Sequence, residues 1–304
     1  MKKTVLLAVM TLSLFSCKKD DNNETTYSNT FPKTIVKDEV SNIGMVKTTE
    51  SYTLDSGNKI TSFTKKIVDN GTPTLDKSYT IDYNGNAIKS IVIRDISQNK
   101  NYTYNFIYSN GMVQSISSND NNLKINYDYV EGKVSNKAVV NGNDKRTFSY
   151  TYGANKIEMV SRQTGVSQND RFTYTLNADG TIASFKKITY IGNVPDAITE
   201  GTCSYQYDNK PNIFQRDVFK YLAEIEIATN NNYYGDYYRD PLLRTVAHNV
   251  VAYTNNLYNN THADYQDLEN ATRSFHYQWN SDNTPKSMEY KKNNNHKAKY
   301  TYNY

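Results

Sequence analysis

Apolar and polar residues alternate in short runs along most of the 304-residue chain, and the runs end at Gly, Asn or Asp. The clearest copy is Tyr79–Ile93 (YTIDYNGNAIKSIVI), where apolar residues alternate with polar ones before Asn84-Gly85 and a second apolar run follows. A period of two is typical of a strand with one packed face, and Asn-Gly favours a tight hairpin. Looser copies recur from Gly44 to the C-terminus, with turns roughly 20–30 residues apart. This spacing leaves room for two strands and two turns per unit.

The apolar residues that follow each turn break the alternation. They come in pairs three positions apart, as in Ile60/Phe63 and Ile88/Ile91. In a regular strand, residues three apart face opposite sides of the sheet. The spacing therefore predicts either a β-bulge after each turn or a sheet with both faces partly covered. The Ile88/Ile91 pair favours the second interpretation.

Consecutive strands are expected to pair as a meander. Basic residues fall at both odd and even positions within or beside the strands, so no continuous apolar face about 25 Å tall is available to lipid; they are Lys65, Lys66, Lys89, Arg94, Lys124, Lys186 and Lys187. We therefore predict a mainly β fold, a many-stranded antiparallel meander that forms a strongly curved sheet or a wide water-soluble barrel. A short helical insert is expected near 212–248.

The insert begins after Pro211, where the repeat stops. Phe214, Val218, Leu222 and Ile225 would share one face of a helix. A long connection inside a meander is typical of a lid, plug or edge cover. A wide barrel needs such a filler, because an empty apolar interior is costly. We expect a single β-meander domain over residues 41–304, with the insert at about 211–248.

Residues 1–16 predict a lipoprotein signal peptide. A basic start precedes the apolar run Val5–Phe15, which is too short to span a membrane well. The run ends in Leu14-Phe15-Ser16-Cys17. This resembles a bacterial lipobox, which implies cleavage before Cys17 and lipidation of its thiol. An ordinary signal peptide with a chance Cys is the alternative. Residues 17–40 are polar and predict a flexible tether, of which Phe31, Ile35 and Val36 could dock onto the domain.

The residues after Cys17 indicate a location. Lys18-Lys19-Asp20-Asp21 resembles the surface-export signal of Bacteroidetes lipoproteins. It implies an outer-membrane protein, anchored by the lipid on Cys17 and facing the cell exterior; a periplasm-facing protein is the alternative. Without residues 1–16, which hold two lysines, the 35 basic residues fall to 33 against 31 acidic ones. This near balance gives no case for nucleic acid as a partner.

We find no catalytic, metal or cofactor motif in the sequence. The four histidines (His248, His262, His276 and His296) do not pair at a short ligand spacing with one another or with a cysteine. Cys203 is expected to be a small buried residue. Nucleotide-binding loops and nucleophile elbows are also missing. We therefore predict no enzyme and no cofactor. A glycoside hydrolase using paired carboxylates stays a weaker alternative, because no pair is selected by the sequence.

The Tyr-rich stretch 229–240 is the best binding candidate in the sequence. It combines stackable rings with polar groups, as sites for sugars and peptides do; the residues are Tyr233, Tyr234, Tyr237, Tyr238 and Arg239. Rings that anchor the insert to the sheet are the alternative interpretation. The tyrosines of the strands are expected to serve in cross-strand packing.

The repeated Y-x-Y-D/N-x-x-G-x-I-x-x-I hairpins resemble YD-type repeats. With the lipobox and the segment Tyr207–Asn212 (YDNKPN) before the insert, residues 45–304 resemble uncharacterised Bacteroidetes surface lipoproteins with a porin-like β domain. The resemblance implies a strongly curved or closed meander and supplies no established activity. We expect a surface-exposed lipoprotein that acts as a non-catalytic binding or scaffold module, with a glycan, peptide or envelope-protein partner. A structural subunit of a cell-envelope complex is the alternative.

Overall fold

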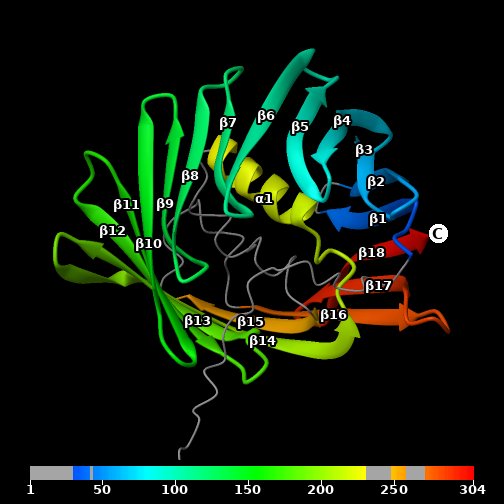
Figure 1. The fold of residues 1–304 in the computed structure, drawn as a ribbon. Helices are drawn as coiled ribbons and strands as arrows, with labels where there is room; N and C mark the ends of the chain where they lie inside the picture. Colours follow the sequence, from blue (N-terminus) through cyan, green and yellow to red (C-terminus); the bar gives the residue numbers. More distant parts are fainter. Residues whose placement is uncertain (1–29, 42–43, 231–247, 258–270) are drawn as a thin grey trace, which may run out of the picture.

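The computed structural model describes residues 30–41, 44–230, 248–257 and 271–304. These residues form eighteen strands and one helix, α1, at Asp217–Asn230 (Figure 1). The strands are β1 Thr34–Ser41, β2 Gly44–Leu54, β3 Ile60–Asp69, β4 Thr72–Asn84, β5 Ala87–Asp95, β6 Lys100–Ser109, β7 Met112–Ser118, β8 Leu123–Val130, β9 Lys133–Asn141, β10 Asp144–Tyr152, β11 Lys156–Gln163, β12 Gln168–Leu176, β13 Ile182–Ile191, β14 Val194–Pro211, β15 His248–Leu257, β16 Ala271–Trp279, β17 Pro285–Lys292 and β18 Asn295–Asn303.

The strands close into an antiparallel barrel. Each strand pairs with the next one along the chain, and β1 pairs with β18 as well as with β2. Thr34 thus lies between Ser51 on one side and Asn303 on the other. The predicted meander is confirmed, and of the two predicted forms the structure is the closed one (Figure 1). Closure removes sheet edges, which would otherwise be open to pairing with other chains.

Most of the turns that join even-numbered to odd-numbered strands carry a β-bulge, although the β10–β11 turn does not, and we call this end of the barrel the bulge end. In the β4–β5 hairpin, Asp82 pairs with Ser90 but Tyr83 pairs with Ile88, which leaves Lys89 as the extra residue. Both Ile88 and Ile91 are consequently buried inside the barrel. The same shift follows β2, β6, β8, β12 and β16. The bulge interpretation is confirmed, and the interpretation of Ile88/Ile91 as residues on two covered faces is wrong.

Tyrosine hydroxyls fasten neighbouring hairpins together at the bulge end. Tyr83 Oη donates to the carbonyl of Ile60 at 2.9 Å, and Tyr129 Oη donates to that of Val113 at 2.8 Å. Each acceptor comes directly before the extra residue of the preceding bulge. The pattern continues around the wall with Tyr152 to Val134, Tyr207 to Ile182 and Tyr304 to Pro285. In Tyr127-Asp-Tyr129 the first ring is buried in the core, whereas the second supplies this hydrogen bond.

The outer face of the barrel is charged. On β3, Lys65 faces the interior, while the next residue, Lys66, points outward and lies 3.4 Å from Asp76. Lys89 and Asp82 form a similar outer pair at 3.2 Å. No helix among the described residues is long and apolar enough to cross a bilayer.

The domain begins earlier than the sequence indicated. Thr34–Ser41 form β1, and both Phe31 and Ile35 are buried, so the predicted tether is too long at its C-terminal end. Phe31 packs edge-on against Tyr52 and stacks on Phe219 of α1. The sequence of β1 looks polar because only alternate residues of the strand face the interior, and this hides its part in the domain.

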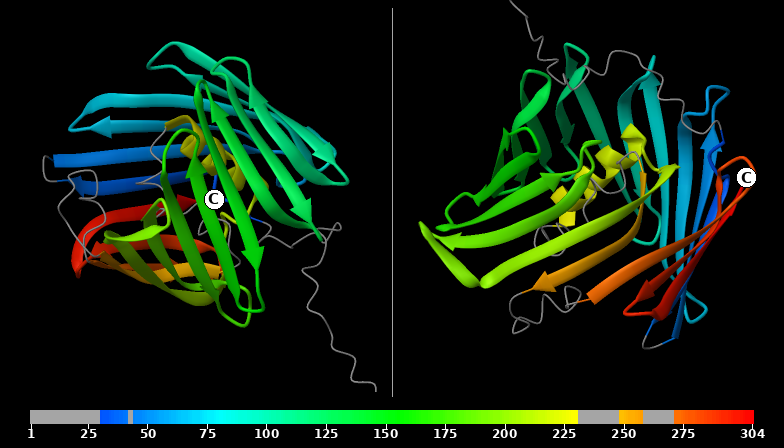
Figure 2. Two further views of the ribbon diagram at one scale, coloured as in Figure 1. Left: turned by 90° about the vertical axis from the view of Figure 1, so that its left-hand side faces the viewer. Right: turned by 90° about the horizontal axis from the view of Figure 1, so that it is seen from below.

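The helix of the predicted insert is confirmed at Asp217–Asn230, whereas residues 231–247 of that insert lie outside the described residues. Helix α1 lies inside the ring of strands (Figures 1 and 2). Asn212 caps the turn before it by accepting the Phe214 N–H at 3.0 Å. Near the helix start, an Arg216 guanidinium nitrogen donates to the carbonyl of Asn58 at 2.6 Å, in the β2–β3 turn of the bulge end. Near the helix end, Asn141 on β9 donates to the carbonyl of Ala228 at 3.0 Å. The helix therefore runs along the lumen from the bulge end towards the opposite end.

Candidate functional site

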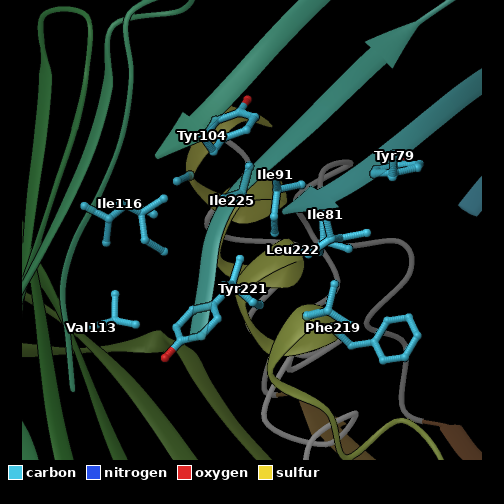
Figure 3. Close-up of a cluster of buried hydrophobic side chains, with 14 of the residues drawn as sticks. Tyr79, Ile81, Ile91, Tyr104, Val113, Ile116, Phe219, Tyr221, Leu222 and Ile225 are labelled. Carbon is cyan, nitrogen blue, oxygen red and sulfur yellow. The ribbon is translucent and has the colours of Figure 1, made fainter. Parts of the chain in front are cut away.

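One face of α1 is packed against the wall of the barrel. Phe219, Tyr221, Leu222 and Ile225 point towards isoleucines and tyrosines of β4–β7 (Figure 3). Tyr221 meets Phe106 edge-on, with ring centroids 5.3 Å apart. The helix thus fills part of the lumen with apolar side chains, as a wide barrel requires.

The register of the strands arranges the inner wall of β2–β5 in rows. Tyr52, Phe63, Tyr79 and Ile93 are directly opposite one another on successive strands. All four are buried, and the rings of Phe63 and Tyr79 stack at 4.1 Å. These four residues form an aromatic row that faces the lumen.

A charged row runs beside the aromatic row. Two residues along each strand, on the same face, lie Glu50, Lys65, Lys77 and Asp95, and they too are directly opposite one another. Lys65 lies 3.5 Å from Glu50, and Lys77 lies 3.4 Å from Asp95. We call these four residues the charged row.

Three of the four residues of the charged row are reached by solvent although the row faces inward. The side chains of Glu50, Lys65 and Lys77 are 24%, 26% and 30% exposed, whereas Asp95 is 5% exposed. In a closed barrel, exposure of an inward-facing side chain means that the lumen is open to water at that level. The inner wall of β2–β5 thus has a partly solvated charged row beside a buried aromatic row.

Helix α1 adds a carboxylate to this part of the lumen. Glu226 is exposed and lies one turn beyond the buried Leu222 on α1. Burial raises the pKa of the Tyr79 phenol, and the negative charges of Glu226, Glu50 and Asp95 raise it further. These three carboxylates are thus close enough to the Tyr79 hydroxyl to affect its ionisation.

A second set of charges lies on the wall of β10–β13. Lys187 is 3.5 Å from Asp170, both are almost fully buried, and Thr189 donates to Asp170 at 2.6 Å. Burial lowers the pKa of Lys187, while Asp170 opposes this shift and nearby Arg146 adds to it. Because solvent does not reach these groups, they serve the stability of the wall rather than capture of a ligand.

The residues predicted from sequence as sites are not among those brought together here. Cys17 and the Tyr-rich residues Tyr233, Tyr234, Tyr237, Tyr238 and Arg239 lie outside the described residues. Cys203 is buried on β14, as predicted. His296 pairs with Glu289 at 2.8 Å on the outer face. Within the described ranges, no three His, Cys, Asp or Glu side chains form a group that could hold a metal ion.

Sequence reasoning missed the charged row, although a signal exists. Each of its members is two positions from a member of the aromatic row, as in Glu50-Ser-Tyr52 and Ile93-Arg-Asp95. Two-residue spacing puts both on one face of a strand. In the sequence, the lysines indicated only that the wall does not face lipid. Their alignment across strands depends on registers that the sequence does not show.

No protein-family model matches the chain, and no curated protein matches it. The solved structures that are similar to it include two porin-like proteins. A porin-like protein from Bacteroides uniformis ATCC 8492 is 12% identical, with 90% of this chain and 98% of that chain covered and a TM-score of 0.45. A porin-like protein from Bacteroides vulgatus ATCC 8482 is 13% identical with the same coverage and a TM-score of 0.42. The predicted likeness to porin-like β-meander proteins of this group is confirmed as a likeness of fold, and it carries no argument about ligand, activity or location.

Proposed function

We propose that the protein is a lipid-anchored envelope protein whose barrel captures a polar ligand in its lumen without transforming it. The observation that carries this proposal is the charged row, which is solvated although it faces the inside of a closed barrel. Ionic side chains on an inner wall are costly unless water or a polar ligand meets them. A lumen built only for stability would bury apolar side chains at this level, as the neighbouring aromatic row does.

Binding is favoured over catalysis by the partners of the carboxylates. Glu50 and Asp95 each lie within 3.5 Å of a lysine ammonium. Lys65 and Lys77 separate Glu50 from Asp95 along the row, so these two carboxylates lie about 14 Å apart, further than a glycosidase pair requires. The wall of β2–β5 is therefore suited to hold charged or hydroxylated groups.

The lumen can be tested with a bulky substitution on each side of the wall. Glu226→Trp would fill the lumen beside the charged row, and Lys89→Trp would place the same ring on the outer face. We expect a ligand found by screening glycans and peptides against the full chain to lose binding to Glu226→Trp and to keep it with Lys89→Trp. Equal binding by both variants would place the ligand outside the lumen.

The anchor is proposed from the lipobox at Cys17 and the acidic residues after it. Cys17→Ala is expected to abolish labelling by a clickable palmitate analogue and to release the protein from membranes. The double variant Asp20→Ala with Asp21→Ala is expected to keep the lipid. It should no longer be digested by protease added outside intact cells. Retention of surface digestion in that double variant would contradict export by the acidic signal.

A structural role in an envelope complex is the second candidate. Val166, Ile191 and Val194 are 44%, 58% and 69% exposed on the adjacent β11–β12 and β13–β14 turns. Exposed aliphatic side chains on neighbouring turns are typical of contact surfaces. Stoichiometric co-purification from membranes that is lost in Ile191→Asp would support this role. The Tyr-rich stretch at Tyr233–Tyr238 stays a prediction for glycan or peptide capture.

A further inference from the structure

The two lysines of the charged row are placed directly against each other. Lys65 pairs in register with Lys77, and both face the lumen. Like charges directly opposite on neighbouring strands destabilise a sheet. Each ammonium contacts a carboxylate on its far side, so Lys65 is drawn towards Glu50 and Lys77 towards Asp95. The order across the wall is carboxylate, lysine, lysine, carboxylate.

We propose that Lys65 and Lys77 together bind the carboxylate of an acidic sugar, such as a uronic acid in a short oligosaccharide. This inference rests on the proposed function and names the ligand class of the same site. A carboxylate between the two ammonium groups forms charge-assisted hydrogen bonds and removes their repulsion. Glu50, whose side chain is 24% exposed, then accepts a hydrogen bond from a hydroxyl group of the sugar, whereas Asp95 stays buried and holds Lys77 in place.

The flanking carboxylate of Glu50 selects a sugar acid over other anions. A bare anion offers no donor to Glu50, whereas the hydroxyls of a sugar do.

The first test uses the unaltered full-length protein. Lysines are modified with limiting acetylating reagent, with and without trigalacturonate, and the acetylation of each lysine is read by mass spectrometry. We expect trigalacturonate to protect Lys65 and Lys77 at least fivefold and to leave Lys66 unchanged, because Lys66 is on the same strand but faces outward. Neutral galactotriose and inorganic phosphate are the comparison ligands.

The second test uses variants with a matched control. Lys65→Gln and Lys77→Gln are each expected to weaken trigalacturonate binding at least tenfold by calorimetry, whereas Lys66→Gln changes it less than twofold. Lys65→Arg with Lys77→Arg should keep binding, because the charges are retained. Added salt should weaken binding by the unaltered protein, since the contact is ionic.

The outcomes separate this inference from the proposed function. If trigalacturonate binds but neither protects Lys65 and Lys77 nor responds to their substitution, the assignment of this row is wrong while capture of a ligand stands. If phosphate protects both lysines as well as trigalacturonate does, the sugar assignment is wrong. If no glycan or peptide binds to the lumen at all, both proposals are wrong.

Discussion

At the scale of single residues, tyrosine does two different jobs in this wall. The 28 tyrosines are far more numerous than the 10 phenylalanines. Buried rings such as Tyr104 and Tyr127 supply apolar area, while Tyr83, Tyr129 and Tyr207 donate to carbonyl groups at the bulges. A bulge leaves backbone groups without strand partners, and a hydroxyl from the adjacent hairpin satisfies one of them. Phenylalanine could replace the first kind of tyrosine and not the second.

Tyr129→Phe is expected to lower the free energy of unfolding by about 1 kcal/mol, because the carbonyl of the buried Val113 loses its donor. Tyr152→Phe is the matched control, since its ring is 37% exposed and water can replace its hydroxyl at Val134. Urea unfolding followed by circular dichroism measures both. Equal losses in the two variants would mean that the hydrogen bond is not what matters.

The sequence indicated the packing tyrosines but not the hydroxyl bonds. Their alternation in Tyr127-Asp-Tyr129 predicts that both rings share a face. Which of them reaches the neighbouring carbonyl depends on the stagger between two hairpins. That stagger is a property of the assembled wall, so no local pattern reports it.

At the scale of elements, a β-bulge lets both apolar residues that follow a turn face the interior of the barrel. Without the extra residue Lys89, Ile88 and Ile91 would face opposite sides, and one of them would be exposed on the charged outer surface. The three-residue spacing in the sequence revealed that something irregular follows each turn. It did not decide between a bulge and two covered faces, because both place two apolar residues out of water. The β10–β11 hairpin has no such shift. Tyr152 pairs directly with Ile157, and Met159, two residues further along β11, is the buried residue.

Helix α1 was predicted from its apolar face, and its place inside the barrel explains that face. Ile225 is 1% exposed, between the strands and the helix (Figure 3). Ile225→Ala is expected to cost about 2–5 kcal/mol, because it leaves a cavity among side chains that cannot collapse around it. Lys220→Ala, on the exposed side of the same helix, should change stability by less than about 0.5 kcal/mol. Thermal unfolding distinguishes the two, and similar melting temperatures would show that α1 is not part of the folded core.

At the scale of the whole molecule, the tyrosines set the response to alkaline pH. Burial raises the pKa of Tyr104 and of Tyr129 to about 12, and it raises the pKa of Tyr127, Tyr221 and Tyr302 well above the ordinary 10.0. A group whose pKa is higher in the folded state stabilises fully below its unfolded pKa, and this contribution is lost as pH rises through the folded pKa. Lys187 acts in the opposite direction, because its lowered pKa relieves a penalty as pH rises towards 10.5. The five tyrosines outnumber this one lysine, so the loss of their contribution dominates the response to alkaline pH.

Stability should therefore fall steeply between pH 10 and 12. Absorbance of tyrosinate near 295 nm is expected to rise together with the loss of the β-sheet signal, since the buried phenols ionise only when the wall opens. A full rise in tyrosinate absorbance with the β-sheet signal intact would contradict this.

At the scale of the whole molecule, the sequence did not predict whether the sheet closes into a barrel. A meander of alternating strands is compatible with an open curved sheet, and nothing in Thr34–Ser41 announces that it pairs on both sides. Whether eighteen strands meet depends on how twist and stagger add up around the ring. The charged row has the same origin, because its four residues meet only when the registers of four strands are fixed.

The double pairing of β1 also decides how the barrel carries a mechanical load. Both ends of the described chain leave from the bulge end, where Thr34 lies opposite Asn303. A pull between the two termini would unzip the β1–β18 ladder one hydrogen bond at a time, which needs little force. A pull on residue 30 against the distant wall of β10 instead shears two ladders along their length, and their hydrogen bonds share the load. A barrel held by its N-terminus and loaded through its wall would therefore resist with two hydrogen-bond ladders in shear.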